Sequence, residues 1–386
     1  MKGLKKILVC LDVRHTASRR MIGGIMRFVA THPAWEAQLA EAHPSDFTLT
    51  DFLDGSADAL VIDGSYRNVP AEDFARLCPR IVVFVNVPPF RAGNRIVASV
   101  HSDERAIALA ATELFLRKKL SNFAFVAPPK PAPWSEARKR FFRAALKEKS
   151  FKLNVFTPTD GATRQTRAAE FARWLDTLPK PCGVWAAYDE LAKHVLDVCR
   201  QQKISVPDQI QILGVDNEPY ICEHTAPSLS SVAPDFEAGG WEIARFIDAA
   251  ANGKPRHAPR RARLAFGVAG VVERLSTMDI NGSARHVAEA CEFIRRNAAA
   301  DIDVPAVAAA VQLSRRLLER NFRTVTGRTV LDFILEERFR RVKKMLKETA
   351  TSVESVCRFC GFRSPTHAMT IFRKRYGLTM TEYRRR

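Results

Sequence analysis

A set of residues near the C-terminus of this chain is repeated 50 positions further along. The residues and their repeats are Ser314, Phe322, Gly327 and Thr329, then Ser364, Phe372, Gly377 and Thr379. An apolar stretch with helical spacing precedes each serine, at Val304–Val311 and again at Val353–Cys360. A duplicated helix–turn–helix explains the repeat economically, because each copy supplies a short helix, a turn and a second helix. This part of the chain is therefore expected to be all helical.

The C-terminal part is also basic. The chain has a net charge of +18, and residues 276–386 hold 22 Lys and Arg against 12 Asp and Glu. Positive charge is about three times denser there than in the first 275 residues. Such charge attracts nucleic acid by releasing the counterions around its phosphates, although charge alone gives only non-specific binding. Together with a duplicated helix–turn–helix, it indicates double-stranded DNA as a partner.

Residues 4–275 follow a different pattern, in which short β-rich runs alternate with helical stretches. The β-rich runs are Ile7–Val13, Ala59–Ile62, Ile81–Val87, Ile96–Val100, Phe123–Ala127, Leu153–Thr157, Gly183–Ala187 and Ile210–Val215. This alternation predicts parallel sheets in an α/β fold, and the length suits two similar lobes. The chain is expected to pass between the lobes near Ser99–Asp103 and again near Ser231–Phe236.

These patterns define the expected domains. Residues 1–275 would form the two-lobed α/β domain, residues 276–283 a short linker, and residues 284–386 the helical domain. The two helix–turn–helix motifs are expected at about 304–325 and about 352–376. Between them, Thr329–Leu346 carries apolar residues at helical spacing and is expected to be a buried strut.

Several classes of protein do not fit this sequence. No apolar run is long enough to span a membrane. The basic start is followed by an apolar run of only Ile7–Leu11, which predicts a first strand rather than a signal peptide. The eight cysteines lack a disulfide framework, and the pair Cys357 and Cys360 is expected to pack in a helical core. We therefore expect a cytoplasmic, nucleoid-associated protein with no metal or other cofactor.

The second helix of a helix–turn–helix lies in the major groove and presents its N-terminal side chains to the bases. A serine before each such helix suits an N-cap, since its oxygen accepts from a free N–H of the first turn. The side chains expected to face DNA are Ser314, Arg315, Arg316, Glu319 and Arg320 in the first copy, and Ser364, Pro365, Thr366, His367, Thr370, Arg373 and Lys374 in the second. Arg373 and Lys374 are expected to contact phosphates, which position a protein without reading sequence.

These stretches resemble the AraC/XylS-type transcription regulators over about 100 residues. The matching residues are Ser314-x3-Leu318-x-Arg320-x-Phe322-x4-Gly327-x-Thr329 and Gly361-Phe362-x-Ser364-x7-Phe372-Arg373-Lys374-x2-Gly377-x-Thr379-x3-Tyr383-Arg384. The resemblance implies sequence-specific DNA binding. The first copy keeps the family's arginine at Arg320, whereas the second has Thr370 at the matching position. We expect the first copy to carry more of the base reading.

Charged residues follow several β-rich runs of the α/β region, at the strand ends where open α/β sheets bind ligands. Asp189 and Asp216 follow two of these runs, and each carboxylate could accept hydrogen bonds from two hydroxyls of a sugar. The alternative interpretation is that both aspartates cap helices. An arginine nearby would offer a rigid donor fork, and a tryptophan a stacking face. The other candidate ligand-binding residues are Asp12, Arg14, Trp134, Arg138 and Asn217.

The α/β region is similar to the periplasmic-binding-protein-like sensor domain of LacI-type repressors. The matching stretches are Trp185-Ala186-Ala187-Tyr188-Asp189, Val206-Pro207-Asp208, Leu213-Gly214-Val215-Asp216-Asn217 and Leu229-Ser230-Ser231-Val232. The resemblance implies that Asp189, Asp216 and Arg138 contact a small-molecule effector. LacI-type proteins carry their DNA-binding domain at the N-terminus, whereas the helix–turn–helix pattern here lies at the other end.

Together these features predict a transcription regulator controlled by a monosaccharide such as xylose or another pentose or hexose, acting on sugar-utilisation genes. The expected partners are an operator DNA, the effector, a second copy of the chain in a homodimer, and RNA polymerase if the protein is an activator. The alternative is an α/β sugar-binding protein or a sugar-processing enzyme without direct gene regulation. No GxSxG, P-loop, HExxH or GxGxxG motif occurs, so no catalytic residue is assigned. Gly23-Gly24 lies in a helical stretch and is expected to permit close packing.

Overall fold

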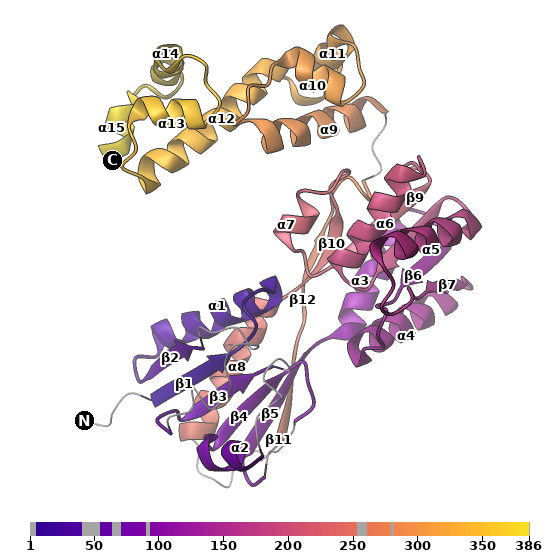
Figure 1. Ribbon diagram of the computed structural model, residues 1–386, viewed down its shortest axis with the longest axis vertical. Coiled ribbons are helices and arrows are strands. Elements are labelled where there is room, and N and C mark those ends of the chain that lie inside the picture. The colour runs from indigo at the N-terminus through magenta and orange to yellow at the C-terminus, as the bar shows by residue number, and fades with distance from the viewer. Residues whose placement is uncertain are drawn as a thin grey trace. The chain divides into compact units, whose positions relative to one another are not determined.

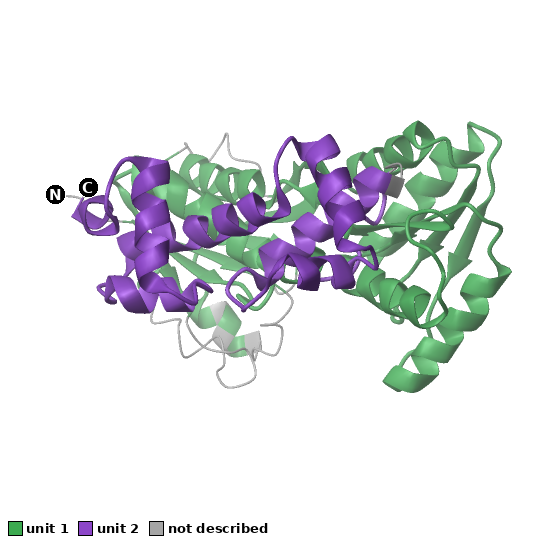
Figure 2. Ribbon diagram, turned by 90° about the horizontal axis from the view of Figure 1, so that it is seen from above, with its two compact units in different colours: residues 1–223, 229–273 green, residues 224–228, 274–386 purple. Residues whose placement is uncertain are grey.

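The computed structural model describes residues 5–40, 55–63, 71–89, 93–252, 261–278 and 282–385. The chain forms two compact units (Figures 1 and 2). The first comprises residues 1–223 and 229–273, and the second comprises residues 224–228 and 274–386. The first unit holds two α/β lobes and the second is helical, which confirms the fold class expected from the sequence.

The N-terminal lobe is built on a six-stranded sheet. Its strands in spatial order are β11 (Arg261–Phe266), β5 (Ile96–Ser102), β4 (Ile81–Val85), β3 (Ala59–Ile62), β1 (Lys5–Cys10) and β2 (Trp35–Leu39). Neighbouring strands pair in parallel. Every residue of β3 and β4 is buried, as expected for parallel strands that are covered on both faces. The helices of this lobe are α1 (Thr16–Thr31), α2 (Ala71–Leu77) and α8 (Phe236–Asn252).

Helices α1 and α8 touch backbone to backbone. A Cβ atom added to Gly24 would overlap the Glu237 carbonyl oxygen, and one added to Gly240 would overlap that of Met21. A Cβ on Gly23 would meet nothing closer than 4.0 Å. Only glycine allows so close an approach. The close packing expected at Gly23-Gly24 is therefore confirmed, and Gly24 is the residue that requires it.

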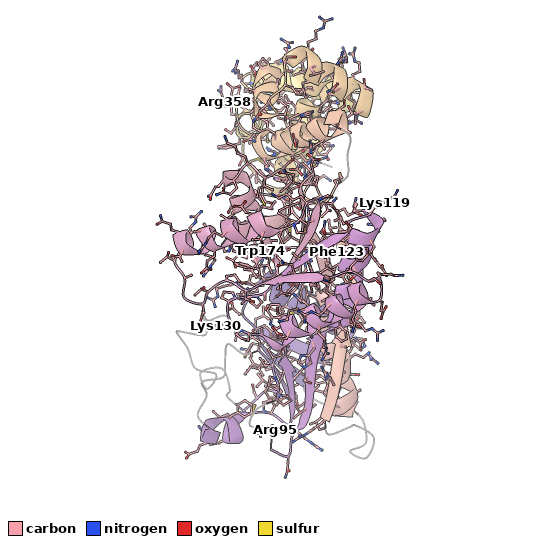
Figure 3. All side chains as sticks on the ribbon, turned by 90° about the vertical axis from the view of Figure 1, so that its right-hand side faces the viewer. Arg95, Lys119, Phe123, Lys130, Trp174 and Arg358 are labelled. Carbon is pink, nitrogen blue, oxygen red and sulfur yellow. The ribbon has the colours of Figure 1, made fainter. Side chains whose placement is uncertain are left out.

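The C-terminal lobe repeats the architecture around a second six-stranded sheet. Its strands in spatial order are β12 (Val268–Val272), β10 (Ser230–Pro234), β9 (Ile210–Val215), β8 (Cys182–Ala186), β6 (Asn122–Val126) and β7 (Leu153–Phe156). Strand β12 pairs antiparallel with β10, and the other pairs are parallel. Its helices are α3 (Glu104–Arg117), α4 (Pro133–Lys147), α5 (Arg164–Thr177), α6 (Asp189–Gln201) and α7 (Pro219–Cys222). Aromatic side chains such as Phe123 and Trp174 fill its core (Figure 3).

Within the described residues, the chain passes between the lobes three times. It leaves the N-terminal lobe after β5, returns after β10, and crosses again between β11 and β12. The first two crossings lie close to the positions expected from the sequence, and the third was not expected. In a parallel sheet the carboxyl ends of the strands lie along one edge, which is where open α/β sheets bind ligands. The charged loops of the candidate ligand site follow the strands at this edge of both sheets.

The second unit is helical. Its helices are α9 (Gly282–Asn297), α10 (Val304–Ala310), α11 (Arg315–Thr326), α12 (Val330–Glu348), α13 (Val353–Phe359), α14 (Pro365–Tyr376) and α15 (Met380–Arg385). One apolar core forms around α10 and α11, and another around α13 and α14. Helix α12 contributes Ile334 to the first core and Phe339 to the second, as expected for a buried strut.

The stretch expected to be a linker, 276–283, begins as packed chain. Ser276 and Thr277 are buried, and the Ser276 N–H donates to the carbonyl of Ser228 at 2.9 Å. Residues 279–281 of this stretch lie outside the described residues.

Candidate ligand site and DNA-binding surface

Asp216 lies at the carboxyl end of β9, in a backbone conformation that non-glycine residues rarely adopt. Its φ is 102°, while its N–H donates to the Val232 carbonyl at 3.0 Å. Such conformations persist where the surrounding structure enforces them, often at ligand sites. Burial raises the pKa of Asp216, and the charge of Arg138 opposes the shift. No described side chain donates a hydrogen bond to the Asp216 carboxylate, so this group is available to a ligand.

Asp189, the first residue of α6, is bonded on both carboxylate oxygens. Its Oδ1 accepts from the Ser231 hydroxyl at 2.6 Å, and its Oδ2 accepts from the Glu218 N–H at 2.8 Å and the Cys222 thiol at 3.3 Å. The side chain is only 2% exposed, and burial raises its pKa to about 7. A Cβ at Gly214 would overlap Oδ1, so this glycine makes room for the carboxylate. In this structure Asp189 therefore organises the loops around Asp216.

Arg138 extends from α4 into the same region. Its Nε donates to Glu104 at 2.5 Å, and its Nη1 donates to the carbonyl of Ala187 at 2.6 Å. The guanidinium lies over the Trp134 ring, 4.7 Å from its centroid, and Tyr188 packs against the same ring. Arg138 thus contacts Glu104 and Trp134, and the charges of Arg138 and Glu104 act on Asp216. These residues form one cluster in the C-terminal lobe.

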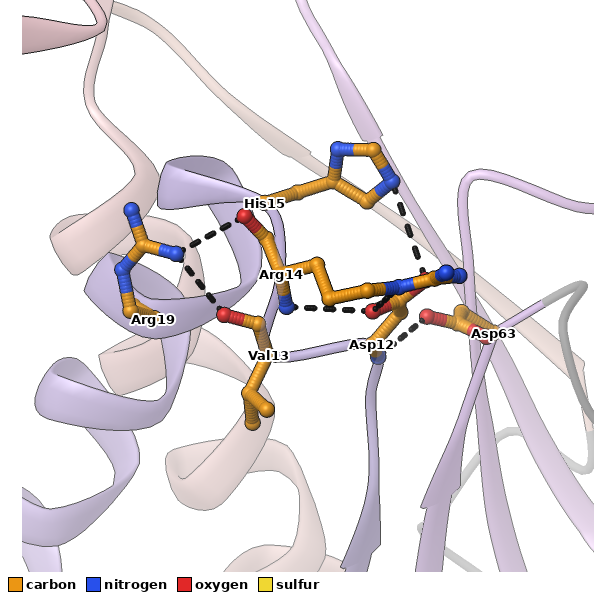
Figure 4. Close-up of polar contacts among 6 residues, drawn as sticks. All are labelled: Asp12, Val13, Arg14, His15, Arg19 and Asp63. Atoms are coloured by element: carbon orange, nitrogen blue, oxygen red, sulfur yellow. Dashed lines mark hydrogen bonds and ion pairs between the residues drawn. The ribbon is translucent and has the colours of Figure 1, made fainter. Parts of the chain in front are cut away.

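On the N-terminal lobe, Asp12 and Arg14 follow β1 and bind each other (Figure 4). The Arg14 guanidinium donates from Nε at 2.8 Å and from Nη2 at 2.5 Å to the two Asp12 oxygens. This fork lowers the pKa of Asp12 to about 2. Asp63, which follows β3, accepts from the Asp12 N–H at 2.9 Å, and His15 lies 3.7 Å from Asp12. Asp12 is buried, whereas the Arg14 side chain is 59% exposed.

Contacts between the lobes close one side of this region. The hydroxyl of Thr16 donates to Glu218, and Arg19 lies 3.6 Å from the same carboxylate. Arg20 donates to the carbonyl of Asn217 at 3.3 Å. Arg138 of the C-terminal lobe and His15 of the N-terminal lobe both influence Asp216 electrostatically, so groups from the two lobes lie within range of this carboxylate. The structure brings the candidates Asp216 and Arg138 together within the C-terminal lobe, and Asp12 and Arg14 within the N-terminal lobe.

Helix α11 presents a basic face. The Ser314 hydroxyl accepts from the Leu317 N–H at 3.3 Å and so caps the helix, while Arg315 and Glu319 form a 3.1 Å ion pair. The predicted DNA-facing side chains of this copy are all exposed. A surface depression of about 510 Å³ lies between α11 and the start of α12. Its lining residues are Arg316, Glu319, Arg320, Arg323, Thr324, Thr329, Val330 and Leu331.

Helix α14 has the matching architecture. The Ser364 hydroxyl accepts from the His367 N–H at 3.3 Å, and Gly377 ends the helix with a left-handed φ of 72°. The exposed candidates of this copy are Ser364, Thr366, His367, Thr370, Arg373 and Lys374. The expectation that Pro365 faces DNA is wrong, because this residue is buried. It is the first residue of the helix, and it is buried like Ala368 and Phe372 of the same helix.

Comparisons with known proteins agree with this architecture. Residues 112–277 match the periplasmic binding protein-like domain family, and residues 307–386 match a helix-turn-helix domain family. The xylose operon regulatory protein of Escherichia coli strain K12 is 28% identical over 289 residues, which cover 74% of this chain and 73% of that protein. The chain resembles an AraC-type transcription regulator with a periplasmic-binding-protein-like sensor domain. It is thus similar to a class of regulators rather than to enzymes.

Solved structures support the fold of this regulator. A xylose-binding transcription activator aligns with a TM-score of 0.61 at 24% identity, covering 99% of this chain and 98% of that one. A LacI family regulator from Enterococcus faecium with bound ribose aligns with a TM-score of 0.54 at 21% identity, covering 72% of this chain and 100% of that one.

The cysteine pair of the regulator packs in the second helical core. Cys357 lies 3.5 Å from the Met380 sulfur and Cys360 lies 3.7 Å from that of Met345. Burial raises the pKa of Cys360 to about 11, which leaves its thiol protonated and unreactive. No group of metal ligands occurs among the described residues, and none of the described helices is long and apolar enough to cross a membrane.

Four polar or charged residues of the site were not among the sequence candidates. They are His15, Asp63, Glu104 and Glu218. Each lies within a few residues of a strand end. The rule that selected Asp12 and Asp216 could have found them, had it been applied to every strand of both sheets.

Proposed function

We propose that the effector of this regulator is a monosaccharide, a pentose or hexose such as xylose, and that the regulator controls sugar-utilisation genes. The observation that carries the proposal is the Asp216 carboxylate, which receives no hydrogen bond from a described side chain and lies at a strand end near Arg138. Asp216 is partly withdrawn from water, and a carboxylate in that position needs hydrogen-bond donors. The vicinal hydroxyls of a sugar are neutral donors that suit it.

The proteins to which the chain is similar favour the same ligand class. They include a xylose operon regulatory protein, a xylose-binding activator and a LacI-type regulator with bound ribose.

We assign the following roles. Asp216 accepts hydrogen bonds from two sugar hydroxyls, and Arg138 donates to a ligand oxygen from the nitrogen that Glu104 and Ala187 leave unused. Trp134 holds the Arg138 guanidinium and, with Tyr188, forms an apolar wall. From the other lobe, the exposed Arg14 reaches the ligand, while Asp12 fixes the direction of its fork.

The proposed response is a shift between conformations of the sensor. A sugar that contacts both lobes stabilises the arrangement in which Thr16 and Arg19 meet Glu218, because binding favours the state that offers more contacts. We propose that two chains act as a homodimer in the cytoplasm, with α11 and α14 in successive major grooves of an operator. If the regulator activates transcription, RNA polymerase is a further partner.

A thermal-shift screen tests the sensor assignment. The wild-type protein is heated with D-xylose, D-ribose, L-arabinose, D-glucose or no sugar, and the Asp216→Asn variant is heated in parallel. We expect one or more sugars to raise the melting temperature of the wild type but not of Asp216→Asn. The matched control is Asp176→Asn, which changes an exposed carboxylate on α5. An equal sugar response in Asp216→Asn would show that the ligand site lies elsewhere.

A further inference from the structure

The second compact unit includes a short segment from far upstream in the chain. Residues 224–228 lie in sequence between α7 and β10 of the sensor region, yet they pack with residues 274–386 (Figure 2). The chain therefore enters the second unit twice, once through this segment and once through residue 274. A single flexible linker would not give this arrangement.

Helix α9 holds the segment through polar contacts. The Ser228 hydroxyl donates to Glu292 and accepts from the Leu275 N–H at 3.3 Å. Arg296 donates to the carbonyl of Thr225 and lies 3.0 Å from Glu292. We call Ser228, Glu292 and Arg296 the α9 clamp. Ser228 is 2% exposed, whereas Glu292 and Arg296 are partly exposed, at 20% and 25%.

The clamp lies where the two stretches of chain that enter the second unit, residues 224–228 and the stretch that begins at residue 274, meet. The carbonyl of Ser228 accepts from the Ser276 N–H at 2.9 Å, and Ser276 and Thr277 are buried beside it. Breaking the clamp therefore removes the partners of a half-buried carboxylate and loosens both connections at once. Burial raises the pKa of Glu292 while Ser228 and Arg296 oppose that shift, which is the signature of a carboxylate that depends on its partners.

Both ends of the segment lead back to the loops around Asp216. Before it, the Cys222 thiol donates to Asp189 at 3.3 Å, and the Leu229 N–H after it donates to the carbonyl of Cys222 at 2.9 Å. Ser231, two residues further on, bonds both Asp189 and the N–H of Asn217. A short, hydrogen-bonded path thus connects the loops around Asp216 with the residues on either side of the segment.

On its other side, α9 is attached to the helix that joins the two helix–turn–helix copies. Arg341 of α12 donates to the carbonyl of Arg295 at 2.7 Å, and Arg295 lies 3.8 Å from Glu337. The Arg295 guanidinium also lies over the Phe333 ring, 5.5 Å from its centroid. Helix α9 is therefore held by the upstream segment on one side and by α12 on the other.

We propose that the α9 clamp is the element through which occupancy of the ligand site is read by the DNA-binding helices. Resting on the proposed function, this inference assigns to Ser228, Glu292 and Arg296 a positioning role, without contact to sugar or DNA. Coupling between distant sites requires an element with two arrangements whose balance both sites affect, and the proposal assigns that role to the clamp.

The test compares sugar binding with its effect on DNA binding in the full chain. The variants are Ser228→Ala, Glu292→Gln and Arg296→Gln, and the matched controls are Ser283→Ala and Glu348→Gln, both on exposed helix positions. The sugar is the one that gives the wild type its largest thermal shift in the panel above. The DNA is a duplex that the wild-type protein enriches from a random-sequence pool. For each protein we measure the dissociation constant for this duplex with and without sugar.

We expect the clamp variants to keep the sugar-induced thermal shift and to bind the duplex without sugar. In each clamp variant, the ratio of the dissociation constants for the duplex with and without sugar should lie closer to one than in the wild type. We expect this change in the ratio to be about fivefold or more, within the usual range of allosteric coupling. Hydrogen exchange across α9 should respond to sugar in the wild type and both controls but not in the clamp variants.

Two other outcomes are distinct. A full wild-type ratio in all three clamp variants overturns the clamp and leaves the sensor assignment intact. No thermal shift with any sugar in the wild type removes the proposed function, and the clamp falls with it. Ser228→Ala and Glu292→Gln are near-isosteric, so a folded variant is available even if Arg296→Gln unfolds.

Discussion

Asp189 is a buried acid whose proton affinity depends on the folded state. Burial raises its pKa from the ordinary 3.8 to about 7, so the folded protein holds the proton more tightly than the unfolded chain. This stabilisation is complete below pH 3.8 and is lost as the pH rises towards 7. Asp189→Asn cannot ionise. We therefore expect the stability of the wild type relative to Asp189→Asn to fall by roughly 2–4 kcal/mol between pH 4 and pH 8.

Urea unfolding followed by tryptophan fluorescence measures this difference, because all five tryptophans lie between residues 35 and 241. Asp176→Asn serves as the control, since its exposed carboxylate should leave the pH profile of the wild type unchanged. Parallel profiles for wild type and Asp189→Asn would mean that the carboxylate ionises as readily in the folded protein as in water.

Arg320 is an exposed side chain on the first recognition helix, beside Arg316 and Glu319 in the basic depression. We expect Arg320→Ala to weaken binding to the selected duplex by roughly 1–3 kcal/mol, because a bidentate contact to a base is lost. Thr370→Ala changes the matching position of the second copy and should cost less. A gel-shift titration measures both, and an unchanged affinity in Arg320→Ala would remove this residue from the interface.

Sequence reasoning treated Asp189 and Asp216 as equivalent strand-end carboxylates, and the structure separates them. The carboxylate of Asp189 is fully used by Ser231, Glu218 and Cys222, whereas that of Asp216 receives no bond from a described side chain. The difference arises from chain segments 29 and 42 residues away from Asp189. The local sequence pattern identifies the residues at strand ends. Only the tertiary fold determines which of their carboxylates already accept hydrogen bonds within the protein.

At the scale of elements, the contact of α1 with α8 gives the sharpest test. A methyl group on Gly24 would overlap a backbone carbonyl, which cannot rotate away as a side chain could. We expect Gly24→Ala to destabilise the sensor by roughly 1–3 kcal/mol through overpacking. Gly23→Ala, one residue earlier, meets nothing closer than 4.0 Å and should stabilise the sensor by roughly 0.5–1 kcal/mol through helix propensity.

Urea unfolding by tryptophan fluorescence separates these two variants. Opposite signs at adjacent residues cannot come from helix propensity alone, so they report the backbone contact itself. Destabilisation of similar size in both variants, or in neither, would contradict the packing described for α1 and α8.

The helix–turn–helix elements were largely predictable because their signals are local. A serine N-cap, a left-handed C-terminal glycine and apolar positions at helical spacing define α11 and α14 at each end. Pro365 shows the limit of that reasoning. Its place at the first helical position followed from sequence, but its burial depends on how α14 packs against the core that it shares with Phe339.

At the scale of the whole molecule, two compact units should unfold separately. Scanning calorimetry of the full chain is expected to give two transitions, of which tryptophan fluorescence follows only one. The sugar that binds the sensor should raise the temperature of that transition. At a concentration 100 times its dissociation constant, it should stabilise the sensor against unfolding by about 2.7 kcal/mol. The selected DNA duplex should raise the temperature of the other transition. A single transition, raised by either ligand and reported equally by calorimetry and fluorescence, would show that the units unfold together.

Two features of the whole molecule escaped the sequence patterns. The third crossing, between β11 and β12, follows a stretch without periodic signal. Both strands are edge strands, and nearly all of their residues are partly or fully exposed. The assignment of residues 224–228 to the second unit depends on Glu292 and Arg296, more than 60 residues downstream. Contacts of such sequence separation leave no local trace.

The late return of the chain to both sheets also governs when each sheet can be completed during synthesis. Strands β11 and β12 complete the edges of two different sheets within a dozen residues, at Arg261–Phe266 and Val268–Val272. During synthesis, the N-terminal lobe lacks its last strand until residue 266 has left the ribosome, and the C-terminal lobe lacks its last strand until residue 272 has done so. By then most of the chain has been translated. The DNA-binding helices emerge directly afterwards, so a nascent chain that carries them has already exposed every strand of its sensor.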